Sequence, residues 1–114
     1  MSDLKSLSKN TIAEAIGLNL TSIEEGVVKG ELPVDHRTHQ PYGLLHGGAS
    51  VVLAETLGSV GSHFLVEQDG KGAVGIEINA NHVRPVSSGT VYGTATLKHK
   101  GGKIHIWSID IKDK

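Results

Sequence analysis

One long helical pattern, over residues 47–68, constrains the fold of this chain more than any other feature. No proline interrupts it, and apolar side chains with one threonine recur there at helical spacing: Ala49, Val52, Leu53, Thr56, Leu57, Val60 and Phe64. Gly58 and Gly61 each cost roughly 1 kcal/mol relative to alanine, which is easier to explain if another backbone passes close to that face. The pattern therefore predicts one long helix with a sheet wrapped around it.

Strand patterns lie on both sides of this helix. Before it we expect a short helix from Asn10 or Thr11 to Ile16, a hairpin of strands 18–24 and 28–34, and a polar loop over 35–43. After a turn at 69–72 we expect strands at 76–80, 91–97 and 103–112. In the last strand the apolar positions change parity, which indicates a bulge or burial on both faces. This order predicts an α+β fold with an antiparallel sheet.

Length and composition narrow the class of protein. A chain of 114 residues is expected to form a single domain, residues 1–114. A formal net charge of −1 predicts no global attraction to nucleic acid or to an anionic membrane. No secretory signal is recognisable, the apolar stretches read as too short to span a bilayer, and cysteine is absent, so a cytoplasmic protein is expected.

A single carboxylate, Glu55, interrupts the apolar helix. It forms a thin polar stripe with Ser59 and Ser62, at positions i, i+4 and i+7. One interpretation is a solvated residue on the outer face of an amphipathic helix. The other is a carboxylate in a partly buried groove, where a raised pKa suits general-base work or direct attack on a carbonyl.

His46 precedes the same helix by one residue. Nine positions separate it from Glu55, which is about two and a half turns and roughly 13 Å along the axis. If both serve one site, a second subunit must supply one of them, and a two-fold dimer with antiparallel helices does so. Gly47 and Gly48 then offer free N–H groups to a carbonyl oxygen. The alternatives are a histidine that satisfies a nearby backbone group and an ordinary glycine-rich helix start.

Two segments together resemble a known family. "QPYGLLHGGASVVLAETLGS", residues 40–59, and "EINANHVRPVSSGTVYG", residues 77–93, are similar to the hotdog-fold acyl-CoA thioesterases. The branch is that of the phenylacetate-pathway, enterobactin-proofreading and 1,4-dihydroxy-2-naphthoyl-CoA thioesterases. The resemblance runs from about residue 26 to 112 and rests on the joint pattern of Gln, His-Gly-Gly, Glu and Asn-His-x-Arg-Pro.

The resemblance implies a reaction and a set of site residues. The substrate would be an acyl-CoA, with an aromatic or similarly bulky acyl group, and no cofactor is implied. Glu55 would attack the thioester carbonyl or activate water, while the N–H of Gly47 polarises the carbonyl oxygen. Gln40 and His46 of the partner subunit would orient the thioester, and Ser59 would help to place water or substrate. The branch also implies a tetramer made of two dimers.

Coenzyme A would lie against two further groups of residues, by the same resemblance. They are Gly75 with His82, Val83, Arg84 and Pro85, and the loop made of His99, Lys100, Gly101, Gly102 and Lys103. Independently, the lysines at 98, 100 and 103 place positive charge and donors around a Gly-Gly turn, which suits phosphates. The other interpretation of that loop is a solvated hairpin tip.

Other readings remain. Family members usually continue past "IDIKDK" with a turn and a long strand, so either the chain is truncated or its sheet is one strand short.

Histidines 36, 39, 99 and 105 lie in separate segments without a His-Glu-x-x-His helix, so no metal site is expected. No Gly-x-Ser-x-Gly elbow exists. A non-catalytic acyl-CoA-binding domain stays open, and hydratase chemistry on this fold is the weaker option.

Overall fold

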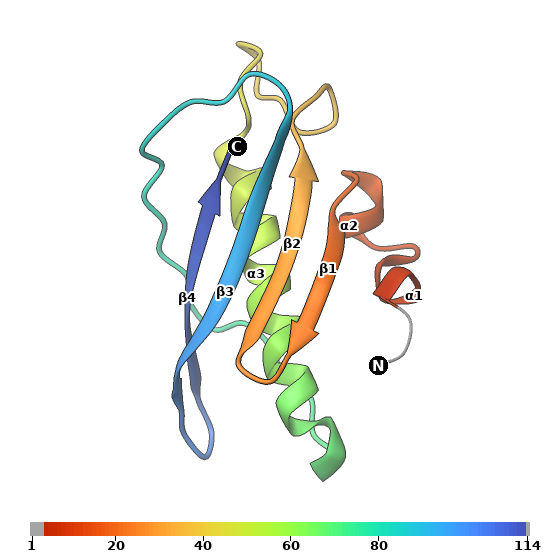
Figure 1. Ribbon diagram of the computed structural model, residues 1–114, viewed down its shortest axis with the longest axis vertical. Coiled ribbons are helices and arrows are strands. Elements are labelled where there is room, and N and C mark those ends of the chain that lie inside the picture. Colours follow the sequence, from red (N-terminus) through yellow and green to blue (C-terminus); the bar gives the residue numbers. More distant parts are fainter. Residues whose placement is uncertain (1–3, 114) are drawn as a thin grey trace.

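The computed structural model describes residues 4–113, which form a sheet with one long helix against a single face (Figure 1). The sheet is antiparallel in the order β1-β2-β3-β4, with β1 at Asn19–Glu24, β2 at Val27–Pro33, β3 at Thr90–Lys100 and β4 at His105–Lys112. The helices are α1 at Leu4–Ser8, α2 at Ile12–Ala15, α3 at Gly47–Val66 and a 3-10 turn, η1, at Glu67–Asp69. The predicted domain limits, Met1 and Lys114, lie outside the described residues.

The core lies between α3 and the sheet. Its most deeply buried side chains are at most 1% exposed and come from both layers: Val28, Leu32, Leu53, Leu57, Val91 and Ala95. Gly30 and Gly93 pair opposite one another in β2 and β3, directly beneath the helix. A Cβ at Gly93 would lie 2.9 Å from Leu57 Cδ1, and one at Gly30 would lie 3.0 Å from Leu57 Cδ2. These glycines therefore let α3 settle close onto the sheet.

The segment over residues 71–89 corrects the sequence prediction. A strand was expected at 76–80, but the backbone there forms no ladder and runs as an irregular connection outside β4 (Figure 1). Alternating isoleucines form a strand only where a neighbouring strand is available, because the hydrogen bonds of a strand join its backbone to that of its neighbour. Within residues 4–113, β4 ends the sheet and pairs with β3 alone.

Most of the other predicted elements are confirmed. The hairpin of β1 and β2 turns at Gly26, whose φ of 82° favours glycine. The long helix begins at Gly47 as expected, and α2 falls inside the predicted short helix, whereas α1 was not anticipated. A bulge was one of the two expectations for the last strand, β4. The bulge lies in β3 instead, where the β3–β4 register shifts between Leu97 and His99.

The membrane prediction needs a correction. The segment Gly47–Asp69 is long and apolar enough to cross a bilayer by length and composition, with a mean hydropathy of 1.3. In this single chain 28% of its apolar window is buried, and Leu53, Leu57 and Gly61 are among the buried residues. Packing on the sheet therefore accounts for part of its apolar character.

Trp107 of β4 explains why one of the two positions inside the helix, residue 61, is a glycine. A Cβ at Gly61 would lie 2.5 Å from Trp107 Cη2 and 2.9 Å from Val28 Cγ2, so side chains, rather than the expected backbone, crowd this position. The indole cannot simply swing away, since its Nε1–H donates to Ser62 Oγ at 2.8 Å. At Gly58 the nearest atoms to a Cβ lie at 3.8 Å, which is an ordinary contact.

These two glycines give a matched test of packing. Gly61→Ala is expected to lower the free energy of unfolding by about 1–3 kcal/mol through overpacking. Gly58→Ala is expected to be neutral or to add up to about 1 kcal/mol, because alanine is the better helix former. Urea denaturation of both variants measures the difference. Equal stability of the two variants would contradict the packing described here.

Candidate active site

His46 caps the N-terminus of α3 with its ring. The backbone N–H of Gly48 donates to His46 Nδ1 at 2.7 Å. An Nδ1 that accepts is unprotonated, so in the neutral ring the proton is on Nε2, which is a donor. The interpretation that His46 satisfies a nearby backbone group is therefore confirmed, and it leaves Nε2–H free to act on a ligand.

The loop before His46 is held by buried contacts. The N–H of His46 donates to the carbonyl of Thr38 at 2.7 Å, and Leu45 donates to Val86 at 2.8 Å. Thr38 is 2% exposed, and its hydroxyl donates to the carbonyl of Pro33 at 2.7 Å. The ring of His46 is thus fixed relative to the end of β2 and to the residues before β3.

Arg37 and Asp35 brace the start of that loop. Arg37 Nη2 donates to Asp35 Oδ2 at 2.8 Å, and the backbone N–H of Arg37 donates to Oδ1 at 2.9 Å. The side-chain hydrogen bond from Arg37 is the main cause that lowers the pKa of Asp35 to about 2. The carboxylate therefore stays charged, and the brace intact, down to strongly acidic pH.

Gln40 uses half of its amide inside the loop. Its Oε1 accepts from the backbone N–H of Tyr42 at 2.6 Å and of Leu44 at 3.3 Å. The carbonyl of Leu44 in turn accepts from the N–H of Gln40 at 2.7 Å. Because the oxygen is occupied, the NH₂ group is the part of this side chain that can meet a ligand, and it is a donor.

Gly47 has an unpaired N–H at the first turn of α3 within the described chain. Within residues 4–113, no protein acceptor pairs with its N–H, as is usual for the first residues of a helix. A Cβ at Gly47 would lie 3.1 Å from His82 Nε2, so the His82 ring lies beside this N-terminus. The sequence did not predict this neighbour, because it depends on the path of the irregular segment over residues 71–89.

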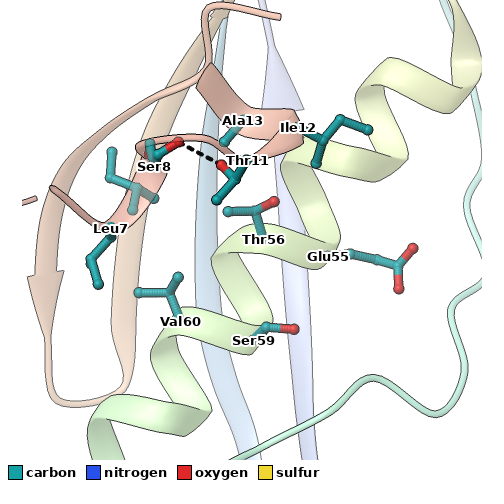
Figure 2. A pocket seen from close by; sticks show the side chains of 10 residues that line it. Leu7, Ser8, Thr11, Ile12, Ala13, Glu55, Thr56, Ser59 and Val60 are labelled. Carbon is teal, nitrogen blue, oxygen red and sulfur yellow. Dashed lines mark hydrogen bonds between the residues drawn. The ribbon is translucent and has the colours of Figure 1, made fainter. Parts of the chain in front are cut away.

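Glu55 is exposed on α3, two and a half turns after His46. A Cβ at Gly75 would lie 3.2 Å from Glu55 Oε2, so the carboxylate lies against the irregular segment. Glu55 borders a hollow of about 280 Å³ beside α1 and α2, but its carboxylate is exposed and points away from those helices (Figure 2), so no partly buried groove surrounds the carboxylate in a single chain. The helix between His46 and Glu55 is unbroken, so one chain keeps the two side chains apart, as the sequence predicted.

The expected polar stripe divides into two parts. Ser59 accompanies Glu55, and Figure 2 shows both side-chain ends pointing away from α1 and α2. Ser62 instead is 7% exposed and faces β4, where its Oγ pairs with His105 Nδ1 at 2.7 Å and with Trp107. Ser62 therefore joins the helix to the sheet and belongs to no groove with Glu55.

The two groups expected to bind coenzyme A lie far apart in one chain. Residues 82–85 are exposed and approach the N-terminus of α3 through His82. The loop over 99–103 is the tip of the β3–β4 hairpin, at the opposite end of the molecule (Figure 1), and closes with a 2.8 Å bond from Gly101 N–H to the carbonyl of Ile104. Both groups can contact one ligand only if two chains contribute.

No cluster of three or more metal-ligating side chains occurs within residues 4–113. The groups described above are hydrogen-bond donors and a carboxylate. Gly47 N–H, His46 Nε2–H and the amide of Gln40 belong to the start of α3 and the loop before it, and such donors suit a polarised carbonyl oxygen. Glu55, further along the same helix, is a carboxylate of the kind that can act as a base or a nucleophile.

Comparison with known proteins identifies the family of this chain. The sequence-family model of the thioesterase superfamily matches residues 42–114. The proofreading thioesterase EntH of Klebsiella pneumoniae is 48% identical over 111 residues, covering 97% of this chain and 80% of the relative.

Two solved structures share the fold throughout. Thioesterase HI1161 of Haemophilus influenzae superposes with a TM-score of 0.90 at 44% identity, over 97% of this chain and 79% of that one. A mutant of thioesterase PA1618 of Pseudomonas aeruginosa gives 0.91 at 43% identity, over 98% and 83%. The chain therefore belongs to the thioesterase superfamily, has its hotdog fold, and is a thioester hydrolase.

Proposed function

We propose that this chain hydrolyses acyl-CoA thioesters with an aromatic or similarly bulky acyl group. The observation that carries the proposal is the placement of two sets of polar groups along α3, which we interpret as two half-sites. Its N-terminus presents the donors of Gly47, His46 and Gln40, and its middle presents Glu55 with Ser59. The first set can stabilise negative charge on the carbonyl oxygen of a thioester, and the second set can act on its carbonyl carbon.

A two-fold dimer joins the half-sites. When α3 of the partner runs antiparallel, Glu55 of one protomer faces His46 of the other, and two equivalent sites result. Exposed apolar side chains on the irregular segment support such an interface, since Val74, Ile76 and Val83 are 87%, 80% and 90% exposed in the single chain. We extend this to a tetramer of two dimers, formed by single-domain chains of residues 1–114 in the cytoplasm.

The chemistry follows from the donors and the carboxylate. The thioester oxygen accepts from Gly47 N–H and His46 Nε2–H, which favours the tetrahedral state. Glu55 then either takes a proton from water, which adds to the carbonyl carbon, or adds to that carbon itself and is released by water. In both routes the carbon–sulfur bond breaks, and the products are a free acid and the thiol of coenzyme A.

Coenzyme A accounts for the two remote groups of residues. The β3–β4 hairpin carries Lys98, Lys100 and Lys103 at its exposed end, where phosphates can be met by charge and donors. Residues 82–85 would hold the part of the ligand nearer to the thioester, beside the start of α3. One similar structure supports the acyl class, since it is PaaI of a phenylacetic acid degradation operon.

The test is release of thiol from a panel of acyl-CoA esters. We expect kcat/KM to be highest for compact aryl esters and lower for long straight-chain fatty esters. Thiol release from fatty esters only would refute the acyl class, and binding of esters without thiol release would favour a non-catalytic acyl-CoA-binding domain. A chelator is expected to leave turnover unchanged, because the proposed groups are side chains and backbone N–H donors.

A further inference from the structure

The loop before α3 is closed by an antiparallel bridge between His39 and Leu45. Gln40 and His46, the two side-chain donors of the proposed half-site, each directly follow one member of this bridge. Inside the bridge the turn is also closed, because the N–H of Gln40 donates to the carbonyl of Leu44 at 2.7 Å. The positions of both donors therefore depend on where this bridge lies.

Both members of the bridge are joined to the chain segment that leads into β3. The N–H of Leu45 donates to the carbonyl of Val86 at 2.8 Å. The Nε2–H of His39 donates to the carbonyl of Ser87 at 2.9 Å, since a carbonyl oxygen can only accept. The first of these bonds is made by backbone alone, whereas the second depends on the imidazole of His39.

Val86 and Ser87 directly follow residues 82–85, the stretch proposed above to hold coenzyme A. Between residues 72 and 85, no hydrogen bond joins this stretch to another part of the described chain, residues 4–113. The first hydrogen bonds after it are those of Val86 and Ser87. They therefore tie the end of the coenzyme A stretch to the loop that carries the donors.

We propose that His39 is a positioning residue, which keeps the stretch for coenzyme A in register with the donors for the thioester carbonyl. Its Nε2–H is occupied by Ser87, so it acts through the loop and not on the thioester itself. A ligand anchored at residues 82–85 then brings its thioester to a set distance from Gln40 and His46.

This role uses binding energy from a remote part of the substrate. Contacts far from the reacting atoms can be used to orient the reacting group, and in that case the benefit is seen in kcat. A substrate that lacks the remote part gains nothing from such an arrangement. The inference rests on the acyl-CoA thioesterase function proposed above.

The experiment compares two thioesters of the same acid. Benzoyl-CoA carries the whole of coenzyme A, whereas the benzoyl thioester of N-acetylcysteamine lacks the nucleotide and most of the arm that leads to it. His39→Phe keeps a ring at this position and removes the N–H donor. Its kcat/KM for benzoyl-CoA is expected to fall about 5- to 10-fold, mainly through kcat, as for loss of one hydrogen bond. For the short thioester, kcat/KM is expected to stay within about twofold.

A rescue variant and a matched control complete the experiment. His39→Gln places an amide N–H near the position of Nε2 and is expected to return benzoyl-CoA turnover to within about twofold of the unaltered protein. His36→Phe makes the same chemical change three residues earlier, where the side chain is 89% exposed and lies 4.0 Å from Asp35 Oδ1. It is expected to change turnover of either ester by no more than about twofold. Circular dichroism and thermal melting check that each variant is folded.

The outcomes separate this inference from the function on which it rests. If the unaltered protein releases thiol from no ester, the proposed function fails and the role of His39 fails with it. If thiol is released but His39→Phe slows both thioesters equally, or slows neither, only the positioning role is overturned. The same holds if His39→Gln is as slow as His39→Phe, because the hydrogen-bond donor is then not what matters.

Discussion

Replacement of Glu55 by alanine is expected to lower kcat for thiol release by about 10²–10⁴-fold, the range found for loss of a positioned general base. The donors of Gly47 and His46 remain in this variant, so the thioester is still bound and polarised. KM is therefore expected to change much less than kcat. A coupled assay that follows the free thiol of coenzyme A measures both constants.

Two further variants serve as comparisons for Glu55→Ala. Glu55→Gln keeps the size of the side chain but can neither accept a proton nor form an acyl intermediate, and it is expected to be as impaired as Glu55→Ala. Glu67→Ala removes an exposed carboxylate of η1 near the other end of the helix and is expected to keep full activity. Turnover of Glu55→Ala equal to that of Glu67→Ala would exclude Glu55 as the catalytic carboxylate.

Mixing two inactive variants is expected to restore activity, because in the proposed dimer each site takes its donors and its carboxylate from different chains. His46→Asn removes the Nε2–H donor but leaves a side-chain oxygen that can cap α3, and loss of such a donor costs about 10²–10³-fold in kcat. In a mixed dimer of His46→Asn with Glu55→Ala, one site keeps both His46 and Glu55. Random reassortment of equal amounts should therefore restore about a quarter of the unaltered activity.

A second mixture provides the control for complementation. The double variant His46→Asn with Glu55→Ala is combined with the unaltered chain in equal amounts and allowed to reassort. Sites shared between chains leave about a quarter of full activity, because mixed dimers are dead, whereas sites within one chain leave about half. Zero activity in the first mixture together with half in the second would place each site inside a single chain.

The sequence predicted those parts of the fold that local pattern determines. The long helix, the β1–β2 hairpin and the position of His46 one residue before the helix all follow from short-range spacing. The separation of His46 from Glu55 could also be predicted, because the rise of an uninterrupted helix is constant.

Contacts between distant segments were not predictable in this way. Alternation at residues 76–80 is a property of one segment, but a strand requires a paired neighbour, and β4 has only β3 beside it in the described chain. The spacing that joins Ser62 to Glu55 says nothing of Trp107, whose indole draws Ser62 toward the sheet. His82 beside Gly47 and the hollow behind Glu55 likewise depend on how the chain returns to α3.

The cap that His46 forms on α3 has a consequence for how its proton is placed. In a serine protease triad a buried aspartate holds the catalytic imidazole in its working tautomer. Here the N–H of Gly48, 2.7 Å from Nδ1, imposes the tautomer instead. The secondary structure itself performs the orienting task, so the role proposed for His46 calls for no third, acidic residue behind the ring, and the ring is oriented as soon as the helix forms.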